Sequence, residues 1–437
     1  MMDPTLVATF SIFVMLGLMA LGIPVAVAML LVSGTGMMLA VGPNYTLTTF
    51  QTLPYNTAAN YTFAAIPMFV MMGLIAGSTG IVKDIYQAAN MWLAKVRGGL
   101  YMATVIAAAG FGAVNGSTIV GAALFTRIAL PEMIALGYNK GAGIGCIIGA
   151  GTFAAMIPPS ITIVLYGVLT SESIGQLLMA GIVPGILTGV VYLLGIAVLA
   201  RAKPSWTPPP VKKYPLRERL RSLKGVWPIG FVSFLVIGGI YSGLVSPSAA
   251  GAIGAFGVLL VGLVLRRLSK SELVSNVADA ALITAALFFI VMGGTAFSRL
   301  LLVTGFIDVL LEFVNNHGFE PWMVILSLVG IYIVLGMLMD PISMMVMTVP
   351  IVHPLVEGLG YDPIWFAIVM VKLIELSCMT PPVGINLFAA ISAANGQVAT
   401  KEVYFGVLPF VVLELIVLAL LLSLPEITLL LPKIMMG

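Results

Sequence analysis

Two polar, helix-breaking motifs interrupt long apolar stretches in the first half of the chain. Residues 111–118 read Phe-Gly-Ala-Val-Asn-Gly-Ser-Thr, and residues 157–161 read Ile-Pro-Pro-Ser-Ile. In a lipid-facing helix such breaks would leave costly unpaired backbone N–H and C=O groups, so we expect them only where the backbone packs in protein or lines a cavity. There, free carbonyl oxygens suit Na⁺ and free N–H groups suit an anion. These residues therefore indicate ion binding inside a membrane.

The second half of the chain repeats this arrangement in register. Pro381 follows Pro158 by 223 residues (381 − 158), and Asp340 follows Ser117 by the same distance (340 − 117). The tripeptide Leu-Gly-Tyr also recurs at this spacing, at 136–138 and 359–361. One structural unit is therefore predicted to occur twice, with a broken membrane segment in each copy.

We expect two Na⁺ sites, one in each copy. The first lies between residues 115–118 and the break near 157–160, where two prolines lack N–H groups and leave upstream carbonyls free. The second lies between Asp340 and the break at 380–384. A single break of this kind is explained more simply as a kink for packing, but duplication in register favours ion binding. The candidate ligands are Asn115, Gly116, Ser117, Thr118, Gly151, Ile157, Pro158, Asp340, Thr380, Pro381 and Gly384.

Asp340 is the most informative single charge, because it lies between the apolar residues Leu338 and Met344. Ionisable groups inside membrane segments are costly and usually functional. Asp340 is a candidate to ligate Na⁺ or to carry a proton. It is equally a candidate to cap the helix that begins at Pro341, since Asp before Pro is a helix-start signature. The ion-binding and capping roles are compatible with each other.

Few other charges interrupt the apolar stretches. Arg127 and Arg299 are candidates to contact an anionic substrate, together with Ser160 in the first break. Arg127 equally suits a side chain that extends to the membrane interface. Lys372 and Glu375 are three residues apart, and we expect them to neutralise each other as neighbours on one helix.

The composition sets the class of protein. The chain has 437 residues, of which 60% are hydrophobic and 8% charged, which is typical of an integral membrane protein. The apolar runs have helical length and show no alternating barrel strands, so the fold class is all-α polytopic. Cys146 and Cys378 lie inside apolar runs, which argues against a disulfide framework. No Ser/His/Asp arrangement indicates an enzyme. The sequence also has no phosphate-binding loop, so we expect transport to be driven by an ion gradient or by another subunit.

The order of segments predicts two copies, each with scaffold spans, an amphipathic arm and transport elements. Residues 42–62 are uncharged and expected to form a loop. Residues 81–97 are expected to form an amphipathic helix at the interface, with a polar loop as the alternative. The scaffold and arm are predicted at 1–97 and 227–320, and the transport elements at 98–200 (hairpin 98–131, broken helix 141–169) and 321–437 (hairpin 322–356, broken helix 364–395).

The linker 201–226 predicts the orientation. It holds eight of the twenty basic residues and only one acid, Glu218, so the positive-inside rule places it in the cytoplasm. Five spans are predicted between the two hairpins. Because five is odd, the copies enter the membrane from opposite faces, as in the inverted repeats of secondary transporters. The five spans are 141–169, 176–200, 227–245, 248–265 and 281–303.

Several short motifs occur in a specific order along nearly the whole chain. They are Ile66-Pro-Met-Phe69, Asn115-Gly-Ser-Thr118, Leu130-Pro-Glu-Met133 with Gly137-Tyr138, Ile157-Pro-Pro-Ser160, Met339-Asp-Pro341 and Thr380-Pro-Pro-Val-Gly384. This set resembles the large membrane subunit of TRAP transporters (tripartite ATP-independent periplasmic transporters; DctM-like permeases). Relatives often carry a second serine where this chain has Thr118, a difference that keeps the hydroxyl.

The resemblance implies an inverted-repeat, elevator-type transporter of the bacterial inner membrane, with two re-entrant helical hairpins and two broken helices. It implies Na⁺-driven uptake of an organic acid delivered by a DctP-like periplasmic binding protein. A small DctQ-like membrane subunit is expected on a separate chain, because the first span begins at residue 5. The alternatives are a stand-alone Na⁺/dicarboxylate symporter of related fold and, from another class, a channel or a membrane scaffold. The resemblance does not identify the organic acid.

Overall fold

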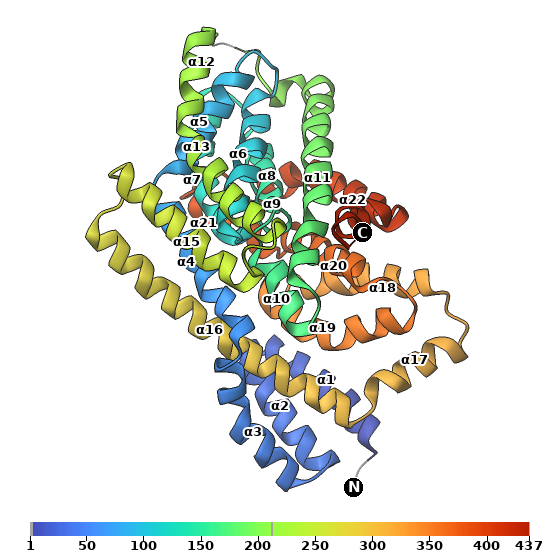
Figure 1. Cartoon of the computed structure of the whole chain (residues 1–437). Helices are drawn as coiled ribbons and strands as arrows, with labels where there is room; N and C mark the ends of the chain where they lie inside the picture. The colour runs from blue at the N-terminus through green and yellow to red at the C-terminus, as the bar shows by residue number, and fades with distance from the viewer. Residues whose placement is uncertain (1–2, 211–212, 437) are drawn as a thin grey trace.

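The computed structural model describes residues 3–210 and 213–436, and every regular element in that part of the chain is a helix (Figure 1). Val211 and Lys212, which belong to the predicted basic linker, lie outside the described residues, as do residues 1, 2 and 437. Seven of the described helices are long and apolar enough to cross a membrane, and two bent helix pairs raise that number to nine. The all-α polytopic fold class is confirmed.

Helix boundaries confirm the duplication. Helix α7 (Thr118–Ala135) and helix α19 (Pro341–Gly358) are offset by 223 residues at both ends (341 − 118 and 358 − 135). Helix α20 (Pro363–Met379) corresponds in the same way to α8 (Lys140–Gly151) and α9 (Phe153–Met156) taken together (363 − 140 and 379 − 156). The sequence repeat is thus a repeat of helices.

The first copy continues on both sides of α7–α9. Its remaining elements are α1 (Pro4–Ala20), α2 (Val25–Ala40), α3 (Pro43–Ala58), a 3₁₀ turn (Tyr61–Ala64), α4 (Ala65–Ser78), α5 (Ile81–Leu93), α6 (Gly99–Asn115), α10 (Ile161–Thr170) and α11 (Ile174–Ala202). The linker contains 3₁₀ turns (Pro204–Trp206 and Leu223–Gly225) on either side of α12 (Leu216–Ser222).

The second copy surrounds α19 and α20. Its remaining elements are α13 (Trp227–Ser233), a π-helical segment (Phe234–Gly238), α14 (Gly239–Tyr241), α15 (Pro247–Val264), α16 (Lys270–Val303), α17 (Phe306–Asn316), α18 (Pro321–Leu335), α21 (Ile385–Ala393), α22 (Thr400–Ser423) and α23 (Glu426–Met436).

The prediction of a loop over 42–62 is wrong, because α3 occupies most of that segment. Gly42 takes a left-handed conformation (φ 94°) and Pro43 then starts the helix. The threonine hydroxyls bond to carbonyls four residues earlier, for example Thr46 to Gly42 at 3.0 Å and Thr57 to Leu53 at 2.9 Å. Polar residues that suggested a loop are therefore satisfied within a helix, which packs on α2 and α16.

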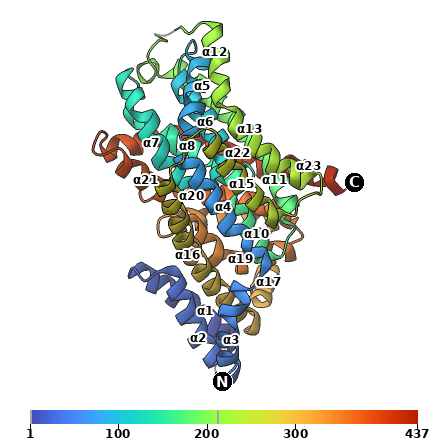
Figure 2. The same ribbon diagram turned by 60° about the vertical axis from the view of Figure 1, so that its left-hand side comes forward.

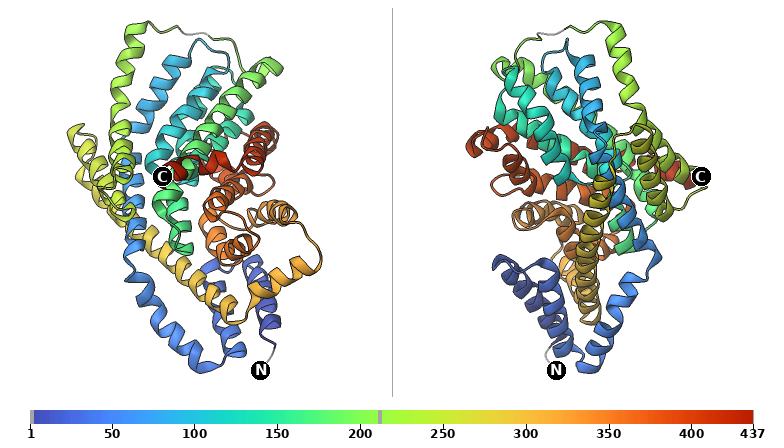
Figure 3. Two further views of the ribbon diagram at one scale, coloured as in Figure 1. Left: turned by 45° about the vertical axis from the view of Figure 1, so that its right-hand side comes forward. Right: turned by 90° about the vertical axis from the view of Figure 1, so that its left-hand side faces the viewer.

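The fifth predicted span begins earlier than expected. Helix α16 starts at Lys270, not near 281, because Ser269 and Glu272 form a reciprocal capping box at its N-terminus. With the offset of 223 residues, α16 covers in one continuous helix the positions that α3 and α4 cover separately in the first copy. Figures 2 and 3 show α16 running from the end of the molecule that holds α1–α3 along the side of the transport elements.

The two broken helices form the buried centre. In α20 every residue from Ile364 to Met379 is buried, and in α8 every residue from Gly141 to Gly151 is buried. Outer helices instead show large apolar side chains to their surroundings: Ile186 and Val198 of α11 are each 62% exposed. An apolar exterior over an apolar core is what a bilayer requires.

In both predicted hairpins, side chains on opposite sides of the tip are in contact. In the first, the Phe111 ring of α6 meets the Phe125 ring of α7, with centroids 6.0 Å apart. In the second, the Tyr332 hydroxyl of α18 lies 2.6 Å from the Thr348 hydroxyl of α19. Each pair joins residues on opposite sides of its tip, so the chain folds back on itself at both places. The depth of the tips in the membrane, and hence their re-entrant nature, stays a prediction.

Candidate functional site

The tips of the two hairpins meet at one small cavity of about 100 Å³. Ser117 at the first tip and Asp340 at the second both line it, although they are equivalent positions of the two copies. The cavity wall is completed by Ile161 and Thr162 after the first break, and by apolar side chains of two outer helices, Val70 and Leu74 of α4 and Ile283 and Leu287 of α16. Tertiary structure thus brings both copies to a single place.

The first tip is shaped by local hydrogen bonds. Gly116 has φ 63°, and the Asn115 side-chain amide donates to the Ser117 carbonyl at 2.8 Å. Ser117 is the N-cap of α7, and its hydroxyl oxygen accepts a long hydrogen bond, of 3.5 Å, from the backbone nitrogen of Val120. A Cβ on Gly116 would lie 3.1 Å from the Ile161 backbone nitrogen, so the tip sits directly against the start of α10. The tip and the first break are therefore adjacent, as predicted.

Asp340 has the capping role that the sequence left open. Its carboxylate oxygen accepts the N–H groups of Ile342 and Ser343, each at 3.1 Å, at the start of α19. The residue is only half-buried and faces the cavity between the tips. A capping carboxylate with one side open to a cavity keeps lone pairs for an ion. An ion role for Asp340 stays a prediction.

The first break bends the chain by 43° between α8–α9 and α10. Ser160 is fully buried and caps α10: its hydroxyl donates to the Ala155 carbonyl at 2.6 Å and accepts the Ile163 N–H at 3.3 Å. Ile157 lies against Gly185 of α11. Pro158 is buried at a cis bond to Pro159, and Gly151 lies within α8 against the first turn of α7.

The second break makes local contacts of its own. The Thr380 hydroxyl donates to the Leu376 carbonyl at 2.6 Å, Pro381 is half-buried at a cis bond to Pro382, and Gly384 lies against the Cys378 carbonyl. Just before the second tip, Gly336 touches Ser377 so closely that a Cβ would collide with it. The end of α20, just before this break, is thus in contact with the second hairpin.

The predicted pair between Lys372 and Glu375 is wrong. The Lys372 ammonium instead meets the Glu414 carboxylate of α22 at 2.5 Å and lies 3.3 Å from the Thr188 hydroxyl of α11. Because α20 is buried on all sides, Lys372 reaches neighbouring helices and not its own. Glu375 keeps a fully buried carboxylate for which neither oxygen has a hydrogen-bond partner among the described residues.

Glu414 is a functional candidate that sequence reasoning missed. Its carboxylate accepts hydrogen bonds from the hydroxyls of Tyr192 and Thr152, each at 2.8 Å, besides the ion pair. The sequence contains a signal for it, since Glu414 is the only acid in the long apolar stretch 404–424. A single charge in such a span usually has a partner inside the protein.

The two arginines proposed for substrate are far from equivalent. Arg127 is exposed on α7. Arg299 of α16 is half-buried and lines a second cavity, of about 390 Å³, between α3, α10, α16 and α19. Polar residues that share this cavity are Asn56, Thr57, Asn60, Thr170, Thr295, Ser298 and His353. Of the two arginines, only Arg299 lines a cavity that would fit a small polar molecule.

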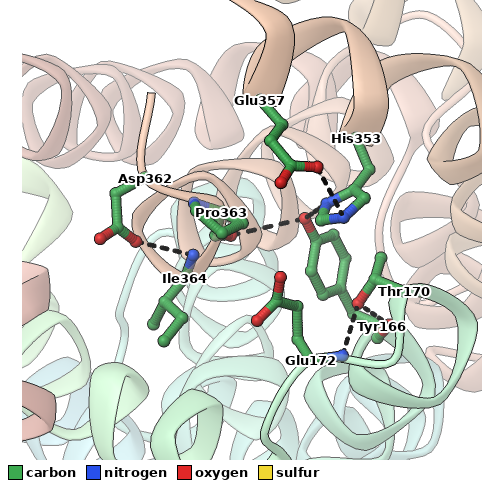
Figure 4. Close-up of polar contacts among 8 residues, drawn as sticks. All are labelled: Tyr166, Thr170, Glu172, His353, Glu357, Asp362, Pro363 and Ile364. Carbon is green, nitrogen blue, oxygen red and sulfur yellow. Dashed lines mark hydrogen bonds and ion pairs between the residues drawn. The ribbon is translucent and has the colours of Figure 1, made fainter. Parts of the chain in front are cut away.

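A polar cluster next to this cavity joins the two copies (Figure 4). The Tyr166 hydroxyl of α10 lies 2.9 Å from Nδ1 of His353 of α19. Beyond them, burial raises the pKa of Glu172, in the loop after α10, and the negative charges of Glu357 and Asp362 raise it further. This end of the molecule is the one opposite the basic linker along α11.

Among residues 3–210 and 213–436, no group of three His, Cys, Asp or Glu side chains is placed to hold a metal ion. A hard monovalent ion such as Na⁺ uses a different set, namely hydroxyl, amide and backbone carbonyl oxygens, which transporters present at broken helices. Asn115, Ser117, Thr118 and Thr162 supply such groups around the cavity between the tips. The donor chemistry there fits Na⁺ and does not favour a transition metal.

Known proteins resemble the whole chain. Residues 12–427 match the family described as "Tripartite ATP-independent periplasmic transporter, DctM component". The C4-dicarboxylate TRAP transporter large permease protein DctM of Pseudomonas aeruginosa is 33% identical over 381 residues, covering 87% of this chain and 88% of its own. The ectoine TRAP transporter large permease protein TeaC of Halomonas elongata is 29% identical, covering 96% and 98%. The isethionate TRAP transporter permease protein DctMQ of Oleidesulfovibrio alaskensis is 29% identical, covering 97% of this chain and 65% of its own.

A solved structure shares the fold. The YdaH transporter of Alcanivorax borkumensis superimposes with a TM-score of 0.58, covering 97% of this chain and 98% of its own at 15% sequence identity. At that identity the likeness concerns the arrangement of helices alone.

Proposed function

Because the chain belongs to the DctM component family of tripartite ATP-independent periplasmic transporters, we propose that it drives uptake of an organic acid with a Na⁺ gradient. Large permeases of this family are multi-pass proteins of the inner membrane, and the seven or more apolar spans agree with that location. The observation that carries the proposal is the single cavity between the two hairpin tips, where hydroxyl, amide and carboxylate oxygens meet inside an apolar protein.

Two features of this cavity support ion-coupled transport. First, the tips come from opposite copies, so an ion or substrate bound between them holds two otherwise separate hairpins together. Second, the ends of α6 and α18 direct their carbonyl groups toward the tips, while the starts of α7 and α19 direct N–H groups there. Carbonyl ends favour a cation and N–H ends favour an anion, so one place suits Na⁺ and a carboxylate together.

The walls of the cavity support an elevator movement as part of this proposal. The outer helices present apolar side chains to the polar tips: Val70 and Leu74 from α4, and Ile283 and Leu287 from α16. Apolar side chains make no directional bonds, so the tips can slide past them without breaking hydrogen bonds. We assign α6–α10 and α18–α21 to the moving part, and α1–α4 and α13–α16 to the scaffold.

Membership of the family supports a substrate class and two partners. The names of the relatives above include C4-dicarboxylate, ectoine and isethionate. The proposed substrate of this chain is therefore a small organic acid or a related polar solute. A tripartite transporter requires two further components, for which we propose a small DctQ-like membrane subunit and a periplasmic DctP-like binding protein. Fusion of both membrane parts in the Oleidesulfovibrio relative supports the small subunit.

Reconstitution in liposomes tests the proposal. The permease with its small subunit and cognate binding protein is expected to accumulate the acid that the binding protein carries when Na⁺ is outside, and not when choline replaces Na⁺. Accumulation by this chain alone would instead identify a stand-alone symporter. Na⁺ flux without any substrate would identify a channel.

A further inference from the structure

Three ionisable side chains are completely buried near the centre of the molecule: Lys372 and Glu375 of α20 and Glu414 of α22. Lys372 and Glu414 neutralise each other through their ion pair. Glu375 is a further acidic group, and among the described residues its carboxylate forms no ion pair of its own and neither oxygen has a hydrogen-bond partner. A buried carboxylate in this state is very unfavourable unless it binds a cation or is otherwise neutralised.

Two more buried polar groups, Thr118 and Asn386, lie next to each other between the first tip and α21. Thr118, at the first tip, is adjacent to Glu375. The Thr118 hydroxyl lies 3.5 Å from both the oxygen and the nitrogen of the Asn386 side-chain amide, in α21 just after the second break. A distance of 3.5 Å is the outer limit of a hydrogen bond, so the hydroxyl and the amide hold each other only weakly. Their oxygens remain available to a ligand.

We propose that Glu375, Asn386 and Thr118, the last of which is also a predicted ligand at the first tip, form a further site for one Na⁺ ion. The ligands would be a carboxylate, a hydroxyl and an amide oxygen, which are the oxygen donors that hard cations prefer. A monovalent ion cancels the one excess charge of the buried group, whereas a divalent ion would leave an excess positive charge. This proposal rests on Na⁺ being the coupling ion.

The position of the site gives the ion a route and a purpose. Thr118 also lines the cavity between the tips, so one ligand of the proposed site faces that cavity. Thr118 belongs to the first copy, whereas Glu375 and Asn386 belong to the second. An ion held by all three would lock the first hairpin to the second broken helix, which links ion occupancy to the arrangement of the moving part.

Binding of ²²Na⁺ to the purified complex of this chain and its small subunit tests the site. Glu375→Gln is expected to bind one Na⁺ fewer, or to need at least about tenfold more Na⁺ for half-saturation, since losing a supporting group at a metal site already weakens affinity by 10–100-fold. Its melting temperature should stay equal or rise, because the variant removes an uncompensated buried charge. The matched control is Glu312→Gln, which makes the same chemical change on the exposed face of α17 and should bind Na⁺ normally.

Asn386→Leu provides a second variant in case Glu375→Gln does not fold, and the same direction of change is expected. Wild-type stoichiometry and affinity in whichever of these variants folds would overturn the site. So would a Glu375→Gln protein whose Na⁺ binding is normal but whose uptake has lost its pH dependence, because that result identifies a proton-binding group. If the wild-type complex binds no Na⁺, both this site and the proposed function are wrong. If the wild-type complex binds Na⁺ and the variants bind it equally well, this site is wrong but the proposed function stands.

Discussion

The ammonium group of Lys372 lies 2.5 Å from the carboxylate of Glu414, and both side chains are completely buried. The two residues are 42 positions apart and on different helices, so this contact ties α20 to α22 through the centre of the molecule. Hydroxyl groups from α11 and from the turn before α9 complete it.

Removing one partner of this pair should strongly destabilise the protein. Lys372→Met leaves the Glu414 carboxylate buried without its counter-charge, and breaking a buried pair in this way costs about 3–5 kcal/mol. Thermal unfolding of the purified protein in detergent measures the loss. The double variant Lys372→Met/Glu414→Gln should recover most of the stability. A single variant as stable as the wild type would contradict the pairing.

Two substitutions separate the capping and ion-binding roles of Asp340. Asparagine keeps an N-cap oxygen but loses the charge, whereas alanine loses both. If Asp340 ligates Na⁺, Asp340→Asn should keep its melting temperature and still require several-fold more Na⁺ for half-maximal uptake. Asp340→Ala should in addition lose about 1 kcal/mol of stability. Normal Na⁺ dependence in Asp340→Asn would restrict the residue to capping.

The same comparison applies to the first tip with Ser117→Ala. This variant should raise the Na⁺ concentration that gives half-maximal uptake, because a hydroxyl ligand at the cavity is lost. Its cap bond is long, at 3.5 Å, so the effect on unfolding should be small. Initial uptake rates over a range of Na⁺ concentrations, at constant ionic strength, provide the measurement. An unchanged Na⁺ dependence would remove Ser117 from the ligands.

Substrate capture should depend on Arg299 more than on Arg127. Arg299 lines the polar cavity of about 390 Å³, whereas Arg127 is exposed on α7. Arg299→Gln should raise the KM for an anionic substrate about tenfold, which is the effect of losing one charged hydrogen bond of about 1.5 kcal/mol. Arg127→Gln should leave KM within twofold. Equal effects of the two substitutions would contradict this assignment.

The conformation of the first tip should require glycine at position 116. Gly116 has φ 63°, and an added Cβ would lie 3.1 Å from the Ile161 nitrogen. Gly116→Ala should therefore lose about 1–2 kcal/mol in unfolding experiments and should also slow transport. Gly137→Ala is a matched control, since Gly137 has φ 77° but open space around it. Gly137→Ala should lose stability without slowing transport. If it also slows transport, the slower transport of Gly116→Ala is not caused by the contact at the tip.

Acid should stabilise the end of the molecule that holds Glu172. The pKa of this carboxyl is raised in the folded protein above its ordinary value of 4.5, mainly by burial. A folded-state pKa that is raised means that folding favours the protonated form, so stability falls as the pH rises from 4.5 through the folded-state pKa. Glu172→Gln should flatten the melting temperature across that range. A variant with the same pH profile as the wild type would contradict the shift.

Much of the fold could be predicted from the sequence because membrane helices obey local rules. Apolar length defines the spans, and Gly, Pro and Asp residues at Gly116, Pro158 and Asp340 mark where helices stop and start. The duplication was visible because those markers recur at a fixed spacing. The same rules failed at 42–62, where threonine hydroxyls bonded to their own helix made a polar segment helical.

The sequence by itself determined the fold class, the two broken helices, the two hairpins and the resemblance to a transporter family. Tertiary structure alone decided which charged groups meet. Lys372 contacts Glu414 and not Glu375, and Ser117 and Asp340 from different copies line one cavity. Pairing of side chains on different helices depends on how those helices pack. In an apolar core an unpaired charge is costly, so a charged side chain pairs with a partner on any helix within reach. Local sequence patterns do not encode that choice.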